Sequence, residues 1–70
     1  MPIIIAPTGA ELTIQKVLVD EKTKRHLESL GILPNSKIMV VSVSNGNVIC
    51  LVKNVRIALN KETATKIIVA

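Results

Sequence analysis

The side chains best able to take part in catalysis or metal binding are the only Asp, the only His and the only Cys of this chain. They are Asp20, His26 and Cys50. A transition-metal site needs three or four converging nitrogen, sulfur or oxygen ligands, and a nucleophilic site needs a base beside its nucleophile. His26 lies beside an apolar stripe in a predicted helix, so we expect a partly exposed helix residue. Cys50 lies mid-strand between two aliphatic residues, where a small buried hydrophobe is expected. We therefore predict no catalytic centre, no resident metal and no cofactor.

The helix that would carry His26 has a clear start and a clear end. Asp20 has the side chain of a helix N-cap. Gly31 stands where a residue with positive φ ends a helix, and Ile32 falls where a Schellman motif closes onto Leu27. The pattern predicts a short helix that begins after Asp20 and ends before Gly31.

The rest of the chain is typical of short strands separated by tight turns. Asn45-Gly46 is the strongest two-residue hairpin signal, and Lys53-Asn54 is a second turn candidate. Where the apolar alternation of the first strand breaks, near Lys16, we expect a bend or bulge. The predicted strands cover residues 11–19, 38–43, 48–52, 55–59 and 66–69.

Two further local patterns complete the order of elements. Leu33-Pro34-Asn35-Ser36 predicts a turn in which the Asn takes a positive φ. Asn60 can cap one helical turn over 61–64. Five strands this short favour a small barrel, because closing the sheet on itself removes exposed edges. The predicted fold class is mainly β: one domain over 1–70, a five-stranded barrel with a short α-helix between the first two strands and a one-turn helix before the last.

Composition excludes several functions and favours others. The chain is 49% hydrophobic but has no Phe, Trp or Tyr, so it lacks a groove for polyproline, a cage for quaternary ammonium and a platform for stacked bases. It also lacks the Gly-rich phosphate cradle of a nucleotide-binding loop. One Cys and no apolar run of membrane-spanning length favour the reducing cytoplasm without membrane insertion. Nine basic against five acidic residues give a net charge of +4, which favours anionic partners.

The chain holds more aliphatic side chains than one small interior needs. The segments 38–43 and 48–52 are apolar on both faces, and successive strand residues point to opposite faces. With Ile38 and Val40 in the core, the other set turns outward unless the helix or the N-terminal segment covers it. An exposed aliphatic patch marks a protein interface. We predict a partner contact at Met39, Val41, Ile49 and Leu51, with Arg25, Lys53 and Arg56 as its charged rim.

An ordered series of aliphatic and glycine positions runs through the chain. It comprises Leu27-x-x-Leu30-Gly31-Ile32-x-Pro34-Asn35-x-x-Ile38-x-Val40, a hairpin, Arg56-Ile57-Ala58-Leu59 and Ala64-x-x-Ile67-x-Val69. Over essentially the whole chain this order resembles the ferrous iron transport protein A (FeoA-like) family. Asn35 and Asn54 stand where that family most often has Gly, and Asn is the residue after Gly that best adopts a left-handed conformation.

The resemblance implies an SH3-like β-barrel in a small cytoplasmic protein. It also implies an accessory role beside the membrane ferrous-iron transporter FeoB, which carries its own cytoplasmic GTPase domain. The same barrel resembles the C-terminal domain of iron-dependent repressors, but we expect no DNA-binding domain within seventy residues.

Three functions stay open at this point. The first is a non-enzymatic accessory of ferrous iron uptake that docks on the cytoplasmic side of FeoB and biases its conformational or nucleotide state. The second is a basic small barrel that binds nucleic acid, which the lack of stacking side chains makes the weaker interpretation. The third is self-association through the aliphatic faces.

Overall fold

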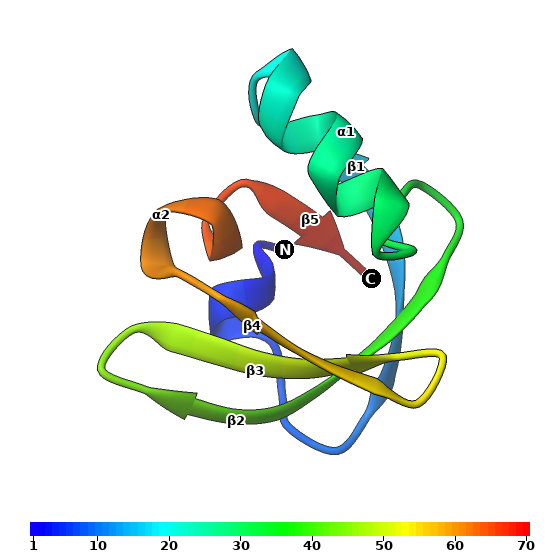
Figure 1. Ribbon diagram of the computed structural model, residues 1–70. Coiled ribbons are helices and arrows are strands. Elements are labelled where there is room, and N and C mark those ends of the chain that lie inside the picture. Colours follow the sequence, from blue (N-terminus) through cyan, green and yellow to red (C-terminus); the bar gives the residue numbers. More distant parts are fainter.

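Five antiparallel strands form one strongly curved sheet that wraps around the core (Figure 1). The computed structural model describes residues 1–70. The strand order is β4-β3-β2-β1-β5, with α1 inserted between β1 and β2 and α2 before β5. This confirms the predicted fold class. The elements are a 3-10 turn η1 (Ile3–Ile5), β1 (Glu11–Val17), α1 (Glu21–Ser29), β2 (Lys37–Ser44), β3 (Asn47–Val52), β4 (Val55–Leu59), α2 (Lys61–Ala64) and β5 (Ile67–Val69).

The first strand is shorter than predicted, but its irregularity is where the sequence placed it. The β1–β5 register shifts between Ile14 and Lys16, which confirms the bulge. The last β1–β5 pair joins Val17 to Ile67, so β1 ends two residues earlier than expected. Leu18, just beyond it, points largely into solvent at 58% exposure. The N–H of Leu18 still donates to the carbonyl of Lys66 at 2.8 Å, but regular pairing ends there because the chain turns from α2 into β5 at this point.

The helix α1 ends in the predicted Schellman motif. The N–H of Ile32 donates to the carbonyl of Leu27 at 2.9 Å, and the N–H of Gly31 donates to the carbonyl of Glu28 at 3.0 Å. Gly31 has φ +92°, which L side chains rarely adopt. A Cβ there would also lie 3.1 Å from Val52 Cγ1 in the core. The left-handed backbone therefore favours glycine, and any larger residue would also force Val52 to shift in the core.

Left-handed residues occupy all three predicted turns. Asn35 has φ 75°, and Asn45 and Gly46 have φ 53° and 82° in the β2–β3 hairpin. In the β3–β4 hairpin both central residues, Lys53 and Asn54, have positive φ, at 52° and 66°. Two such residues match the right-handed twist of the flanking strands. The Asn residues confirm the prediction, whereas the left-handed Lys53 was not foreseen.

The Asn60 side chain caps α2. Its Oδ1 accepts a hydrogen bond from the N–H of Thr63 at 2.8 Å, as the sequence predicted. We expect Asn60→Ala to lower the free energy of unfolding by about 1 kcal/mol, and Asn60→Asp to leave it nearly unchanged. Urea denaturation followed by far-UV circular dichroism measures both variants, since the chain has no aromatic fluorophore. An unchanged midpoint for Asn60→Ala contradicts the capping role.

The N-terminal segment is part of the fold. Ile3 is fully buried in the core, and the Met1 ammonium donates to the carbonyl of Val69 at 2.8 Å. The N–H of Val69 donates back to the carbonyl of Met1 at 2.7 Å, and Pro2 bridges to Ile68. These contacts cover the outer edge of β5. The sequence analysis considered this segment only as a possible shield for an apolar face, and its place in the core was missed.

The barrel stays open along one seam, whereas we expected the sheet to close fully. β4 is the last strand on one side, and it pairs only with β3. No pairing joins β4 to β5, so one edge of β4 stays free.

Neither helix has the length and apolar content that a bilayer crossing requires.

Candidate partner-binding face

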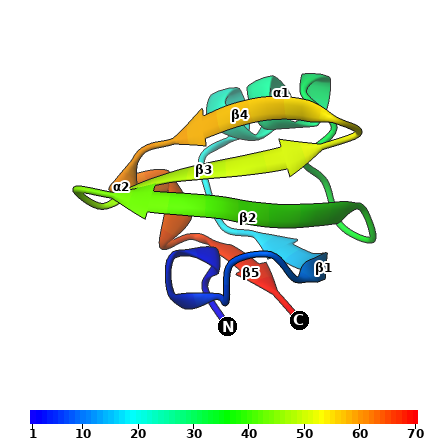
Figure 2. The ribbon, with the colours of Figure 1, turned by 90° about the horizontal axis from the view of Figure 1, so that it is seen from below.

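The outward side chains of β2 and β3 form an aliphatic patch, which we call the outer face. Strand alternation buries Ile38, Val40, Val48, Cys50 and Val52 in the core. The alternate residues point away from the core and are half-buried. Figure 2 shows β2, β3 and β4 side by side, with α1 beyond them. The outer face consists of Met39, Val41, Ile49 and Leu51.

Strand register aligns part of the outer face into a row across four strands. Met39 pairs with Glu11 of β1 on one side and with Leu51 of β3 on the other, and Leu51 pairs with Arg56 of β4. Directly paired residues have Cβ atoms about 5 Å apart, close enough for their side chains to contact. The row therefore has two aliphatic residues at its centre, an acid at one end and a base at the other.

A bulge in β2 adds Val41 to the same face. The β2–β3 register shifts between Val40 and Ser42, so Val41 and Ser42 together oppose Ile49. Ile49 also pairs with Ala58 of β4. The four aliphatic residues predicted for partner contact are thus brought together by the pairing of β2 with β3.

The predicted charged rim is only partly assembled. Arg56 lies in the row beside Leu51, and Lys53 lies exposed in the turn that joins β3 to β4. Arg25 is exposed on α1, which both views place on the far side of the sheet (Figures 1 and 2). Arg25 is therefore separated from the outer face, whereas Glu11, which the sequence analysis did not select, lies on it. Glu11 reaches the outer face because it pairs with Met39 of β2, and a local sequence pattern does not predict such long-range pairing.

The three chemically distinctive residues lie apart from one another. Cys50 is buried in β3, where its Sγ donates to the carbonyl of Ile57 at 3.4 Å. His26 is exposed on α1, and Asp20 is exposed at its N-cap. No group of three or more His, Cys, Asp or Glu side chains is placed to hold a metal ion.

Burial raises the pKa of the Cys50 thiol from 9.0 to about 11. The folded state thus favours the neutral thiol, and the stability that this provides is complete below pH 9 and is lost as the pH rises toward 11. We expect the free energy of unfolding to fall between pH 8 and pH 11 by about 2 kcal/mol more in the wild type than in Cys50→Ala. Urea denaturation across this pH range is the measurement. Equal losses in the two proteins contradict the burial of a neutral thiol.

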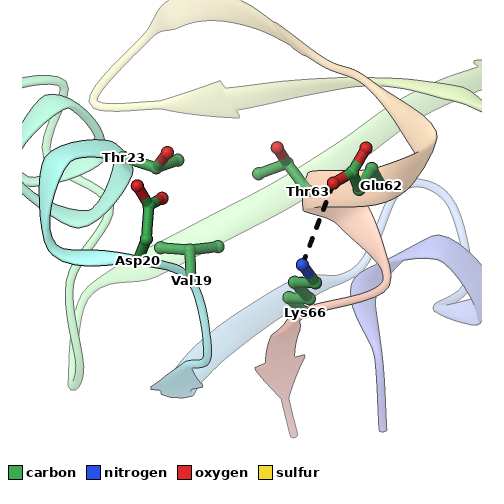
Figure 3. Close-up of a pocket in the computed structure, with 6 residues that line it drawn as sticks. All are labelled: Val19, Asp20, Thr23, Glu62, Thr63 and Lys66. Atoms are coloured by element: carbon green, nitrogen blue, oxygen red, sulfur yellow. Dashed lines mark ion pairs between the residues drawn. The ribbon is translucent and has the colours of Figure 1, made fainter.

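A polar pocket of about 340 Å³ lies between α1 and α2 (Figure 3). The carboxylates of Asp20 and Glu62 and the hydroxyl-bearing residues Thr23 and Thr63 line it, and Lys66 Nζ lies 4.0 Å from Glu62 Oε1. The hydroxyl and backbone N–H of Thr23 lower the pKa of Asp20, although the Asp20 side chain forms no capping hydrogen bond. No local sequence pattern predicts this pocket, because its two acids, Asp20 and Glu62, are far apart in the chain.

Comparison with known proteins agrees with this architecture over the full chain. The family model of the FeoA domain matches residues 1–70. A crystal structure of iron uptake regulatory protein (FeoA) is 28% identical, with a TM-score of 0.85 over 99% of this chain and 92% of that chain. The solution structure of iron(II) transport protein A from Clostridium thermocellum is 25% identical, with a TM-score of 0.89 over 99% of this chain and 44% of that chain.

A more distantly related structure shares only the fold with this chain. A manganese-dependent transcriptional repressor is 18% identical, with a TM-score of 0.84 over 96% of this chain and 39% of that chain, and so shares the fold. No curated protein matches the chain. The sheet order, the helix inserted after β1 and the match over every residue lead to one assignment: the chain belongs to the FeoA family of small accessory proteins associated with ferrous iron transport.

Proposed function

We propose that this chain docks on the cytoplasmic side of a FeoB-type ferrous-iron transporter through its outer face and modulates the transporter by protein–protein contact. The observation that carries the proposal is the outer face itself. Four aliphatic side chains share one surface of a sheet whose opposite surface already fills the core. Their remaining exposed area is apolar surface that a partner can remove from water.

The size of this effect suits a reversible contact. Fully burying an aliphatic side chain stabilises by about 1.5–3 kcal/mol, so completing the burial of these half-buried side chains adds at most about 1 kcal/mol each. Four such residues together provide an anchor at the centre of an interface, while the charges of Glu11 and Arg56 at the ends of the row fix its orientation. The partner surface that fits is aliphatic at its centre, with a base facing Glu11 and an acid facing Arg56.

Modulation requires that the chain bind two states of the transporter differently. A ligand with equal affinity for both states shifts neither population, however tightly it binds. The GTPase domain that the family relationship implies for FeoB supplies two such states, with GTP or GDP bound. The proposed role needs no chemistry from the chain itself.

The test is a titration of the chain against full-length FeoB in nanodiscs, loaded with GDP or with a GTP analogue. Two variants carry the same charge reversal: Arg56→Glu on the outer face and Arg25→Glu on α1. We expect Arg56→Glu to weaken binding on the order of tenfold and Arg25→Glu to have little effect, because only Arg56 lies beside Leu51. Absence of binding in both nucleotide states contradicts the proposal, as does an equal loss in the two variants.

The same titration addresses the two other functions. Nucleic-acid binding gains no support from an outer face whose centre is aliphatic in a chain without aromatic side chains. Self-association through the outer face predicts concentration-dependent sizing that Leu51→Asp abolishes. A chain that forms dimers at the concentrations used and does not bind FeoB favours self-association over docking.

A further inference from the structure

A groove follows the free edge of β4, where the sheet fails to close. We call it the seam groove. It consists of the polar pocket between α1 and α2 and an adjoining cavity of about 300 Å³ between α1 and β4. The two share Thr23 and Thr63, so they form one continuous channel with α1 as one wall and β4 followed by α2 as the other. We propose that the seam groove binds an extended peptide segment that adds as a strand to β4, with an aliphatic residue at one end of the groove and a basic residue at the other.

The cavity beside β4 is the apolar end of the groove. Leu27 of α1 and Leu30 at its C-cap line one side, and Ile57, Ala58 and Leu59 of β4 line the other. Leu30 is 37% exposed although it lies directly against this apolar surface. An aliphatic side chain entering here would contact leucines on both walls and remove their exposed area from water.

The edge of β4 offers hydrogen bonds that no part of the chain uses. The pairing of β3 with β4 runs from the pair Val52 and Val55, beside the two-residue turn, to the pair Val48 and Leu59. In such a hairpin the closing pair exchanges hydrogen bonds and the pairs then alternate, so the backbone groups of Arg56 and Ala58 point away from β3. An added strand satisfies these groups and gains its register from them.

At the opposite end of the sheet, the N-terminal segment covers the outer edge of β5. There Met1 and Pro2 pair with β5 through two backbone contacts to Val69 and a bridge to Ile68. Exposed edges promote unwanted pairing, and proteins cover or charge them. The edge of β4 is paired with no strand, and the seam groove lies between it and α1.

The polar end of the groove determines the charge of the occupant. Asp20 and Glu62 are two of only five acidic residues in a chain with nine basic ones, and both face this end (Figure 3). Only Lys66 lies close enough to either carboxylate to form an ion pair, and it pairs with Glu62. Asp20 is exposed and ionised at neutral pH, and the neighbouring Thr23 lowers its pKa further. A Lys or Arg of the bound segment therefore complements this end, whereas an acidic residue is repelled.

A single extended segment fits the groove better than a second copy of the chain. Strands in a sheet lie about 4.8 Å apart, so an edge-to-edge dimer brings β4 of each copy directly against the other. The helix α1 already flanks that edge, as the shared lining of the groove shows. We therefore expect α1 to hinder a whole second barrel at this edge more than a single extended segment.

Selection from a phage library of random decapeptides on the immobilised full-length chain tests this inference. We expect an enriched consensus with an aliphatic residue followed by Lys or Arg, and the synthetic consensus peptide is then titrated against variants. Leu30→Ser and the double variant Asp20→Asn with Glu62→Gln should each weaken peptide binding at least tenfold. The matched controls are Leu33→Ser, with the same 37% exposure outside the groove, and Glu28→Gln on α1, and both should bind as the wild type does.

A third variant tests the added strand itself. Ala58→Pro removes an edge N–H that β3 does not use, and edge strands tolerate proline there. We expect it to weaken peptide binding, with circular dichroism confirming the fold. If that variant unfolds, backbone amide shifts of Arg56 and Ala58 on adding the peptide to the wild type give the same information.

Each contrary outcome overturns the inference. The selection could enrich no peptide or an acidic consensus. Leu30→Ser and Leu33→Ser could lose the same peptide affinity, or the backbone amide shifts along β4 could stay unchanged when peptide is added. Leu51→Asp separates this site from the outer face, because it should leave peptide binding unchanged while weakening contact with FeoB. The results for Leu51→Asp therefore distinguish failure of peptide binding in the seam groove from failure of docking through the outer face.

Discussion

Replacing Ile3 with Ala is expected to lower the free energy of unfolding by about 3 kcal/mol, one of the two largest effects we expect. Ile3 is fully buried in the core although it lies near the start of the chain. Truncating a buried Ile removes transfer free energy and leaves a cavity, which together cost about 2–5 kcal/mol. Chains of this size have little stability in reserve, so the loss is a large share of the total. Urea denaturation followed by circular dichroism measures it.

Ile5→Ala is the matched control for Ile3→Ala. Ile5 belongs to the same 3-10 turn but is 69% exposed. We expect its unfolding midpoint to differ little from that of the wild type, since little buried surface is lost. If the two variants lose the same stability, the N-terminal segment does not hold Ile3 in the core as described.

The other large effect concerns docking: Leu51→Asp is expected to weaken binding to FeoB on the order of a hundredfold. The substitution removes an aliphatic side chain from the centre of the outer face and places a charge where the partner excludes water. The fold should survive, because Leu51 is only half-buried and its neighbour Arg56 can pair with the new carboxylate. Binding to FeoB in nanodiscs is the readout, with circular dichroism as the check on folding.

The control for Leu51→Asp is the same substitution at Leu18. Leu18 is 58% exposed just past the end of β1, away from the outer face. We expect Leu18→Asp to bind FeoB like the wild type. Equal losses at the two positions mean that general surface hydrophobicity, and not the outer face, drives the contact.

Local patterns were sufficient to predict most of the fold. The Schellman motif at Gly31, the cap at Asn60 and the hairpin at Asn45-Gly46 each depend on residues a few positions apart, and all three are confirmed. The bulge near Lys16 could be predicted because it interrupts a regular alternation. In these cases the chemistry of one or two side chains decides the backbone conformation.

What escaped prediction depends on contacts between distant segments. Burial of Ile3 requires that the N-terminus reach β5, and the free edge of β4 follows from strand order, which hydrophobic alternation does not encode. For the same reason only part of the predicted charged rim lies beside the outer face. Arg25 was selected by charge alone, whereas Glu11 joins the outer face through its register with Met39.

The two surfaces have distinct physical characters. The outer face is an aliphatic patch on the convex side of the sheet, whereas the seam groove is a channel beside a free strand edge with acids at one end. A convex aliphatic patch suits a folded partner surface, and a free strand edge suits an extended segment. Variants at Leu51 and Leu30 address the two surfaces separately.

Photo-crosslinking in cells that express the chain together with FeoB tests docking through the outer face most directly. A photoreactive amino acid is placed at Ile49, in the middle of the outer face, and in a second strain at Leu18, which lies outside it. Docking through the outer face predicts a crosslinked species containing FeoB from position 49 and none from position 18. Crosslinking to FeoB from position 18 alone, or from neither position, would contradict the account.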